Sequence, residues 1–308
     1  MIQDHTADTL RPQGPQILVP MTQMPGVPAL FGKLLALAMV RSPNLSLDTH
    51  LKNACIIFRN HRIDKDKLRG FKQVCGYDPD TDSMPAPFIQ TLFIGLVSKF
   101  IGSPYFPITP MGLIQVSQSF ELKQALSAEI PLDLFCRLLD MTQTDRGIHT
   151  RFSMEAKISQ GEDDALPVWQ GVATYFTRAK HPGPKNIKKR EDIPLPLEET
   201  MGVPENTGRQ YAAVSGDYNP HHLYGWTARF MGFKQAIAHG MWSLARSCAN
   251  LEKAFGYPET FELEGEFKLP IFLPATITLG IAPRQDGARF ELRDQDQKLP
   301  HLKGSFRF

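Results

Sequence analysis

The chain has 308 residues, of which 42% are hydrophobic and 21% are charged, and its formal net charge is +2. This composition is typical of a soluble globular protein with a large apolar core, built as one big domain or as two of ordinary size. The small net charge, without a basic stripe interleaved with aromatic residues, argues against a nucleic-acid-binding protein.

The N-terminal segment and the cysteines indicate the cellular compartment. Residues 1–13 carry acidic residues and a proline where a signal peptide would need a basic patch and an apolar run. The apolar stretch 27–40 contains Lys33 and is too short to cross a bilayer, so it predicts a packed amphipathic helix, with contact at a membrane surface as the minor alternative. The four cysteines form no C-x-x-C pair, which favours reduced thiols over a zinc knuckle or a disulfide framework. We therefore expect a cytoplasmic protein without stable membrane insertion.

Each half of the chain is predicted to contain a short helix, a turn, a longer helix and then several strands. In the first half the longer helix begins at Pro87 and is apolar nearly all round, as expected of a helix enclosed on most sides. Its counterpart in the second half begins at Gly240 and has apolar residues at helical spacing. Both runs end in G-x-P, at residues 102–104 and 256–258, where a helix stop is followed by a residue that cannot continue the helix.

Two pairs of segments repeat weakly between the halves. Residues 71–76 match residues 211–216 at a constant offset of 140, and residues 116–127 match residues 263–274 at an offset of 147. Because the order of features is the same in both halves, we predict two copies of one α+β fold, each a helix wrapped by an antiparallel sheet.

A stretch rich in proline and charge lies between the two copies. It runs over residues 180–200 and includes the basic run 185–190, which is typical of a solvated linker. The predicted division is therefore an N-terminal domain of residues 1–179, a linker of residues 180–200, and a C-terminal domain of residues 201–308.

The densest cluster of reactive side chains lies in residues 211–222. A turn-forming glycine at 216 is followed by Asp217, and Asn219-Pro220 then forces a tight turn that can bring Asp217 and His222 together. A carboxylate and an imidazole that converge on one point suit general acid–base catalysis. The N–H of Gly240, at the start of the long helix, can stabilise an oxygen that becomes negative.

This cluster resembles the signature of MaoC-like (R)-specific enoyl-CoA hydratases and 3-hydroxyacyl-thioester dehydratases. The residues that carry the resemblance are Tyr211, Ser215, Gly216, Asp217, Asn219, Pro220, His222, Ala228, Gly232, Phe233, Ile237, Ala238, His239, Gly240 and Met241. The resemblance implies a catalytic pair of Asp217 and His222 and an oxyanion donor at Gly240. It leaves Ser215, Asn219, His221 and His239 as residues that bind substrate or shape the site. His221 is a departure, because the family usually has a branched aliphatic residue there, and it puts the substrate range in doubt.

The order of the whole chain is similar to that of the double-hotdog members of this family, in which the first hotdog domain is degenerate. At the offset of 140, the counterparts of Asp217, Asn219 and His222 are Tyr77, Pro79 and Asp82. Pro87, near the position equivalent to Gly240, has no N–H to donate. We therefore expect one active site per chain and an N-terminal domain that accommodates the acyl chain.

The resemblance implies a hydro-lyase that interconverts a trans-2-enoyl thioester and an (R)-3-hydroxyacyl thioester in fatty-acid or polyester-precursor metabolism. The expected partner is an acyl-CoA or an acyl carrier protein thioester, without a cofactor or a metal, and a homodimer is one assembly that the sequence allows. Zinc binding by Asp217 and the histidines is disfavoured because adjacent histidines in a turn seldom reach one ion.

Other interpretations remain open at this point. Asp217 could simply form a turn or cap, and His222 could be a satisfied core histidine. A hotdog acyl-thioesterase would also use a carboxylate, although the N-P-x-H turn and the H-G-M helix start favour hydration. A non-catalytic acyl-thioester-binding subunit is the third alternative, and the presence of both Asp and His argues against it.

Overall fold

A computed structural model gives the structure of most of the chain. It describes residues 17–23, 51, 53–110, 112–159, 165–179, 195–296 and 300–308. The predicted helix over residues 27–40 and the basic run 185–190 lie outside the described residues. None of the helices formed by the described residues is long and apolar enough to cross a membrane.

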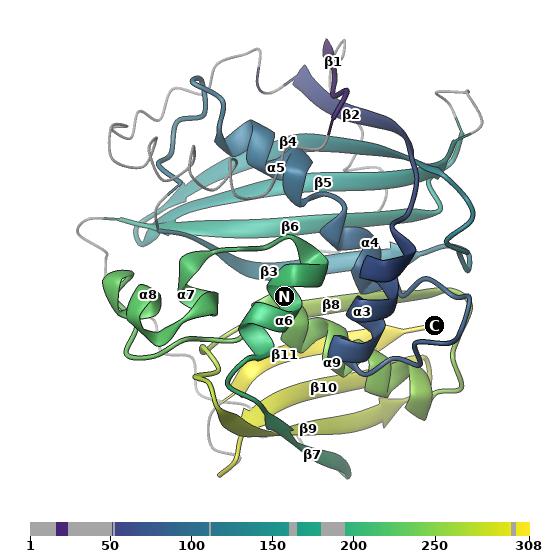
Figure 1. Ribbon diagram of the computed structural model, residues 1–308, viewed down its shortest axis with the longest axis vertical. Helices are drawn as coiled ribbons and strands as arrows, with labels where there is room; N and C mark the ends of the chain where they lie inside the picture. The colour runs from purple at the N-terminus through teal and green to yellow at the C-terminus, as the bar shows by residue number, and fades with distance from the viewer. Residues whose placement is uncertain are drawn as a thin grey trace.

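The described residues form one sheet of eleven strands that runs through the whole protein (Figure 1). In spatial order the strands are β1 (Ile17–Pro20), β2 (Ala54–His61), β4 (Leu132–Thr144), β5 (Gly147–Ile158), β6 (Trp169–Arg178), β3 (Leu113–Leu122), β8 (Phe261–Phe267), β11 (Pro300–Arg307), β10 (Gly287–Asp294), β9 (Ala275–Arg284) and β7 (Leu197–Val203). Neighbouring strands are antiparallel except for the parallel pair β1–β2.

The two halves of the chain occupy the two halves of this sheet, which join where β3 pairs with β8. Helices α4 (Ala86–Thr91) and α5 (Ile94–Ile101) lie on the first half, and α9 (Gly240–Ala254) lies on the second (Figure 1). The inward faces of strands and helices share one large apolar core. This arrangement confirms the predicted α+β fold in which a helix packed on an antiparallel sheet occurs twice.

Two short helices carry the first repeat. Helices α3 (Lys65–Cys75) and α6 (Thr207–Ser215) both end at a glycine in the left-handed region, Gly76 with φ 81° and Gly216 with φ 83°. Glycine adopts this conformation without the steric penalty of a Cβ atom. The helices contact each other, and the repeated aromatic residues Phe71 and Tyr211 meet with ring centroids 5.9 Å apart.

The second repeat lies where the halves join. Gln118 of β3 is opposite Gly265 of β8 in the register, and these two residues are also equivalent at the offset of 147. A residue that pairs with its own equivalent lies next to the axis that relates the copies. The join is therefore a local two-fold axis, which explains why the two halves form one continuous sheet.

The first-half helix differs from the prediction, because it begins at Ala86 rather than Pro87 and is broken into α4 and α5. At the break the hydroxyl of Thr91 donates to the carbonyl of Phe88 at 2.7 Å. The N–H groups of Leu92 and Phe93 donate to carbonyls only three residues back, a tighter winding than the α-helix. The threonine hydroxyl takes up a main-chain acceptor, which bends the helix at this turn.

The predicted linker also ends earlier than the sequence suggested. Strand β7 begins at Leu197 and pairs with β9, from Leu197 opposite Ile281 to Val203 opposite Ala275. Residues 197–200 are therefore part of the second half of the sheet, and residues 180–194 lie outside the described residues.

Candidate active site

The segment from α6 to α8 (Gly225–Phe230) carries the reactive side chains. After Gly216 the chain leaves the helix, and a new short helix, α7 (Pro220–Leu223), begins at Pro220. Proline suits the first position of a helix because its fixed φ is helical and its missing N–H would have no partner there. Asp217 thus precedes the turn and His222 follows it, and the N–H of His222 donates to the carbonyl of Asn219 at 3.0 Å.

Asp217 uses one carboxylate oxygen to build this turn. Its Oδ1 accepts hydrogen bonds from the main-chain N–H of Asn219 at 3.2 Å and from Asn219 Nδ2 at 2.8 Å. The N–H of Asp217 donates to Ser215 Oγ at 3.2 Å. The structural role considered from the sequence is therefore real, but it occupies only Oδ1. The side chain is 28% exposed, so Oδ2 can meet a small molecule.

His222 is buried, with 7% of its surface exposed, and one of its nitrogens is fixed. Nδ1 lies 2.8 Å from the carbonyl oxygen of Ile237. A carbonyl oxygen only accepts, so Nδ1 carries the hydrogen and Nε2 keeps a lone pair. Burial lowers the pKa of His222 well below its usual value, and the neighbouring His239 and His221 lower it further. His222 is therefore neutral near pH 7 and can accept a proton at Nε2.

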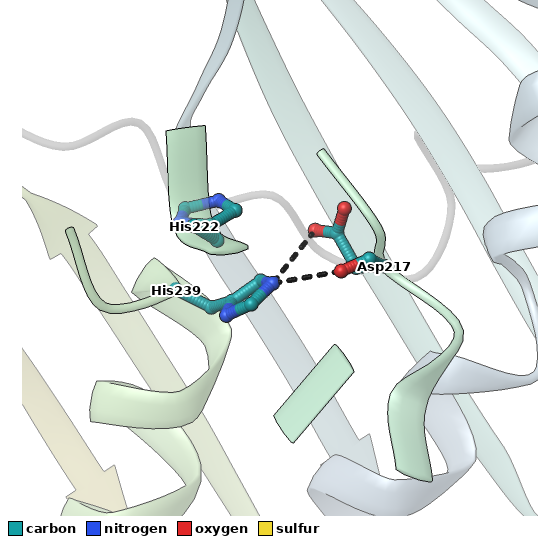
Figure 2. Close-up of side chains that lie close together, drawn as sticks. All are labelled: Asp217, His222 and His239. Atoms are coloured by element: carbon teal, nitrogen blue, oxygen red, sulfur yellow. Dashed lines mark hydrogen bonds and ion pairs between the residues drawn. The ribbon is translucent and has the colours of Figure 1, made fainter. Parts of the chain in front are cut away.

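His239 connects Asp217 and His222 (Figure 2). Its Nε2 lies 2.9 Å from the main-chain oxygen of Asp217, and its ring stacks on the His222 ring at 3.6 Å between centroids. One oxygen of Asp217 and one ring nitrogen from each histidine lie within 4.8 Å of one another. The structure thus brings together side chains from the turn, from α7 and from the residue before α9.

His221 lies beside this group. Its ring centroid is 4.0 Å from that of His222 and 5.3 Å from that of Phe233. Burial lowers the pKa of His221, and the charge of Asp217 opposes this shift. A neutral imidazole therefore stands at the usually aliphatic position and packs directly against the His222 ring.

Gly240 is the first residue of α9, directly after His239. Because it opens the helix, its N–H has no intrahelical acceptor, and the helix dipole adds partial positive charge there. A Cβ atom at this position would lie 3.0 Å from the Phe267 ring, closer than most such contacts. Glycine thus lets the start of α9 lie against the aromatic ring without steric conflict.

Comparison with known proteins identifies the domain family of the C-terminal half of the chain. Residues 185–302 match the MaoC like domain family. The C-terminal half of this chain is a MaoC-like domain. Over 292 residues the chain is 27% identical to 3-hydroxyacyl-thioester dehydratase X of Mycobacterium tuberculosis, covering 93% of this chain and 99% of that protein.

Most of the chain, and not only its MaoC-like domain, shares its fold with solved structures. HtdX of Mycobacterium tuberculosis matches with a TM-score of 0.69 and 23% identity, over 82% of this chain and 99% of that one. A MaoC-like dehydratase from Phytophthora capsici matches with a TM-score of 0.67 and 18% identity, over 86% and 98% of the two chains. These matches confirm the predicted hotdog fold.

The MaoC-like site does not suit a metal ion, although Asp217, His222 and His239 lie close enough to be considered as ligands. His222 Nδ1 and His239 Nε2 already face main-chain carbonyl oxygens as donors. The two rings are stacked 3.6 Å apart with 25° between their planes, so their lone pairs lie in two separate, stacked planes. Ligands of one zinc ion must instead converge on it in a tetrahedral arrangement.

The corresponding position of the first half holds a different cluster. Tyr77, the counterpart of Asp217, donates to Glu252 Oε1 at 3.2 Å and packs on Phe71. Cys248 Sγ lies 3.1 Å from the same glutamate oxygen. Burial raises the pKa of Tyr77 well above its usual value. Tyr77 thus has a packing role between the halves, and Pro87 in the first turn of α4 has no N–H to offer an oxyanion.

Two residues of the first half that sequence reasoning missed lie near the MaoC-like site. Tyr175 of β6 faces the core side of the sheet, and the pKa of its hydroxyl is raised by burial and, next, by the charge of Asp217. Gln115 lies opposite Tyr175 in the register and its Nε2 is 3.8 Å from Met241 Sδ, beside Gly240. Alternation along the strands could have given the face of these residues, but nothing local in the sequence could tell which ones reach the other half.

Proposed function

We propose that this protein is a hydro-lyase that reversibly adds water to a trans-2-enoyl thioester to give a 3-hydroxyacyl thioester. The observation that carries the proposal is the pairing of Asp217 and His222, of which one carboxylate oxygen and one ring nitrogen lie within 4.8 Å of each other beside the start of α9. Two hydrogen bonds of roughly 2.8 Å at a tetrahedral angle span roughly 4.5 Å, so one water fits between the two groups. The name of the mycobacterial relative agrees with this chemistry.

In the hydration direction, the water held between Asp217 and His222 attacks C3 of the substrate. A proton leaves this water for the acid–base pair as the C–O bond forms. The pair returns a proton to C2, so that both groups end in the protonation states in which they began. Dehydration follows the same steps in reverse.

Gly240 has the complementary role at the thioester carbonyl. When the water adds to C3, electrons move through C2 onto the thioester oxygen, which becomes negative. The N–H of Gly240, at the positive end of α9, donates a hydrogen bond to this oxygen. The interaction strengthens as the charge develops, so it lowers the barrier more than it improves substrate binding.

The geometry supports a syn addition and, with the family resemblance, an (R)-3-hydroxy product. Asp217 and His222 come from the two ends of one turn, so both approach the same face of the substrate. Chiral analysis of the product from crotonyl-CoA tests this assignment. An (S) product would contradict it.

The activity itself is tested with the purified protein and crotonyl-CoA. Loss of the conjugated enoyl absorbance without release of free thiol supports the hydratase. Thiol release would instead favour a thioesterase, and binding without either change would favour a non-catalytic binding subunit.

We also propose that the first half accommodates the acyl chain and that each protein chain has one active site. Support comes from the apolar core face of its sheet and from Gln115 and Tyr175, which lie near the MaoC-like site. A series of enoyl-CoA and enoyl-carrier-protein substrates of increasing length tests the role of this half and identifies the carrier. A KM that does not change with acyl-chain length would count against the proposal that the first half accommodates the acyl chain. The cytoplasmic location and the homodimer remain predictions from the sequence.

A further inference from the structure

His239 lies where three parts of the site meet. It is the residue just before α9, with an extended backbone of φ −65° and ψ 137°. Its ring contacts both the segment that bears Asp217 and the ring of His222, and the next residue is Gly240. A change at His239 therefore reaches both groups of the proposed acid–base pair.

The first contact holds the main chain of Asp217. Because a carbonyl oxygen only accepts, His239 Nε2 carries the hydrogen that it donates to Asp217 O at 2.9 Å. The same Nε2 is 4.0 Å from Asp217 Oδ2, beyond hydrogen-bonding distance. His239 thus fixes where the aspartate lies without neutralising the oxygen that meets the water.

The second contact supports His222. The two rings stack at 3.6 Å with 25° between their planes. The carbonyl of Ile237, two residues before His239, accepts from His222 Nδ1 and sets its tautomer. Residues 237–240 therefore orient the aspartate and the imidazole and also supply the N–H for the oxyanion.

The surroundings of His239 keep it neutral. Only 2% of its surface is exposed, and burial lowers its pKa to about 3. The titratable groups around it are Asp217, His221, His222 and Tyr211, whose buried ring lies 4.9 Å away. A group that is neutral at all ordinary pH values and donates only to a main-chain oxygen does not supply the protons of the reaction.

We propose that His239 is a positioning residue, which holds Asp217 and His222 at the spacing that one water bridges without itself exchanging protons with the substrate. This inference rests on the proposed hydration activity. It assigns to His239 both a donor function, through Nε2, and a packing function, through the face of its ring.

Two variants separate these functions. His239→Gln places an amide N–H near the position of Nε2 and removes the stacked ring, whereas His239→Phe keeps a stacked ring and removes the donor. Since a misplacement of about 1 Å can cost about 100-fold in rate, we expect each variant to lose roughly 10- to 100-fold in kcat. KM should stay within about threefold of wild type, because the groups that bind the thioester are unchanged. The same substitutions at His149, whose ring packs on Phe176, are the matched controls and should leave kcat unchanged.

A double variant distinguishes positioning from a loss of folded protein. If His239 acts through Asp217, His239→Phe should reduce kcat further by less than about threefold when Asp217 is already asparagine. A general loss of folded protein would instead multiply the two effects, and it would also lower the thermal midpoint.

Nitrogen-15 NMR of the histidines in the wild-type protein gives a readout that needs no substrate. We expect hydrogen on Nε2 of His239 and on Nδ1 of His222 near pH 7. The inference is overturned by the opposite tautomer at His239, by multiplicative loss in the double variant, or by kcat above half of wild type in both single variants. Loss of one limb of the pH–rate profile in both variants would also overturn it, by making His239 an acid–base group. If wild type itself fails to hydrate crotonyl-CoA while the tautomers are as expected, the proposed function fails and the positioning contacts stand.

Discussion

At the scale of single residues, each of the two proposed catalytic groups uses one atom for structure and leaves the other for chemistry. Asn219 holds Asp217 at Oδ1, and the Ile237 carbonyl holds His222 at Nδ1. The remaining oxygen and nitrogen are fixed in place before any substrate arrives. Such preorganisation removes part of the entropic cost of bringing water and catalyst together.

Asp217 and His222 give the sharpest test of this arrangement. Asp217→Asn keeps the size of the side chain but removes the base, and His222→Ala removes its partner. Because a positioned acid or base contributes roughly 100- to 10,000-fold, each change should lower kcat by about that factor. The double variant should lose far less than the product, because the two groups act on one water. Steady-state kinetics with crotonyl-CoA measures this, and Asp217→Asn with more than about a tenth of wild-type turnover would show that Asp217 is not the base.

The buried imidazoles also predict how stability depends on pH. The pKa of His239 is about 3 in the folded protein, whereas a histidine in an unfolded chain titrates near pH 6.5. Between pH 6.5 and pH 3 the unfolded chain binds a proton at this histidine and the folded protein does not. The contribution of neutral His239 to the free energy of unfolding is therefore fully present above pH 6.5 and is lost as the pH falls toward 3. Each such group lowers the free energy of unfolding by at most about 1.4 kcal/mol per pH unit. His221 and His222, whose pKa values are also lowered, act in the same direction.

Urea unfolding between about pH 7.5 and pH 5, where carboxylates stay largely ionised, measures this effect. We expect the free energy of unfolding of the wild type to decrease as the pH is lowered, and that of His239→Gln to decrease less steeply. Equal slopes in the two proteins would mean that His239 titrates normally in the folded state.

At the scale of elements, the repeat in the sequence predicted that α3 and α6 are equivalent, but it predicted neither their contact nor the chemistry between them. The matching glycines ended both helices, as expected, because each takes a conformation that favours glycine. The kink between α4 and α5 was missed. The kink depends on the side-chain conformation in which the Thr91 hydroxyl donates to the Phe88 carbonyl, and the residue types alone do not determine that conformation.

Tyr77 has a structural role that its position in the tertiary structure determines. The sequence assigns Tyr77 no chemical role and predicts at most a several-fold change in activity for Tyr77→Ala. In the structure the side chain packs on Phe71 and donates a hydrogen bond to Glu252. We now expect Tyr77→Ala to lower the free energy of unfolding by about 3 kcal/mol, as for other large-to-small core changes. Tyr77→Phe keeps the ring and should stay within about 1.5 kcal/mol of wild type, the usual contribution of one hydrogen bond.

Chemical denaturation and kcat of the folded protein, measured on both variants, check this assignment. Neither variant should change kcat by more than several-fold. A loss of kcat like that of Asp217→Asn in the stable Tyr77→Phe variant would instead make the first half catalytic.

At the scale of the whole molecule, the continuous sheet makes the two halves one folding unit. Strand β8 pairs with β11 on one side and with β3 on the other. Further contacts cross between the halves, including the hydrogen bond from Trp242 Nε1 to the carbonyl of Val74 at 3.0 Å and the packing of Phe120 on Phe261. Removal of the first half would expose both a strand edge and the apolar surface under it.

A fragment of residues 195–308, which keeps β7 whole, should therefore be poorly soluble. Co-expression of residues 1–194 should restore soluble protein, since it supplies β3 and the covering surface. Size-exclusion chromatography and a hydration assay of the fragment test this. A soluble and fully active fragment would refute the view that both halves build one unit.

The sequence by itself predicted two copies and the residues of the proposed site, and it determined the α+β character that the structure confirms. These predictions rest on local rules: a glycine that ends a helix, an Asn-Pro pair that forces a turn, and apolar residues at helical spacing. The tertiary structure alone decided which atom of each group stays available, since this depends on acceptors such as the Ile237 carbonyl, distant in sequence from His222. The tertiary structure also places Tyr175 near Asp217 and Tyr77 against Glu252. These contacts join residues of different halves, so they depend on how the halves pack and not on the local sequence of either half.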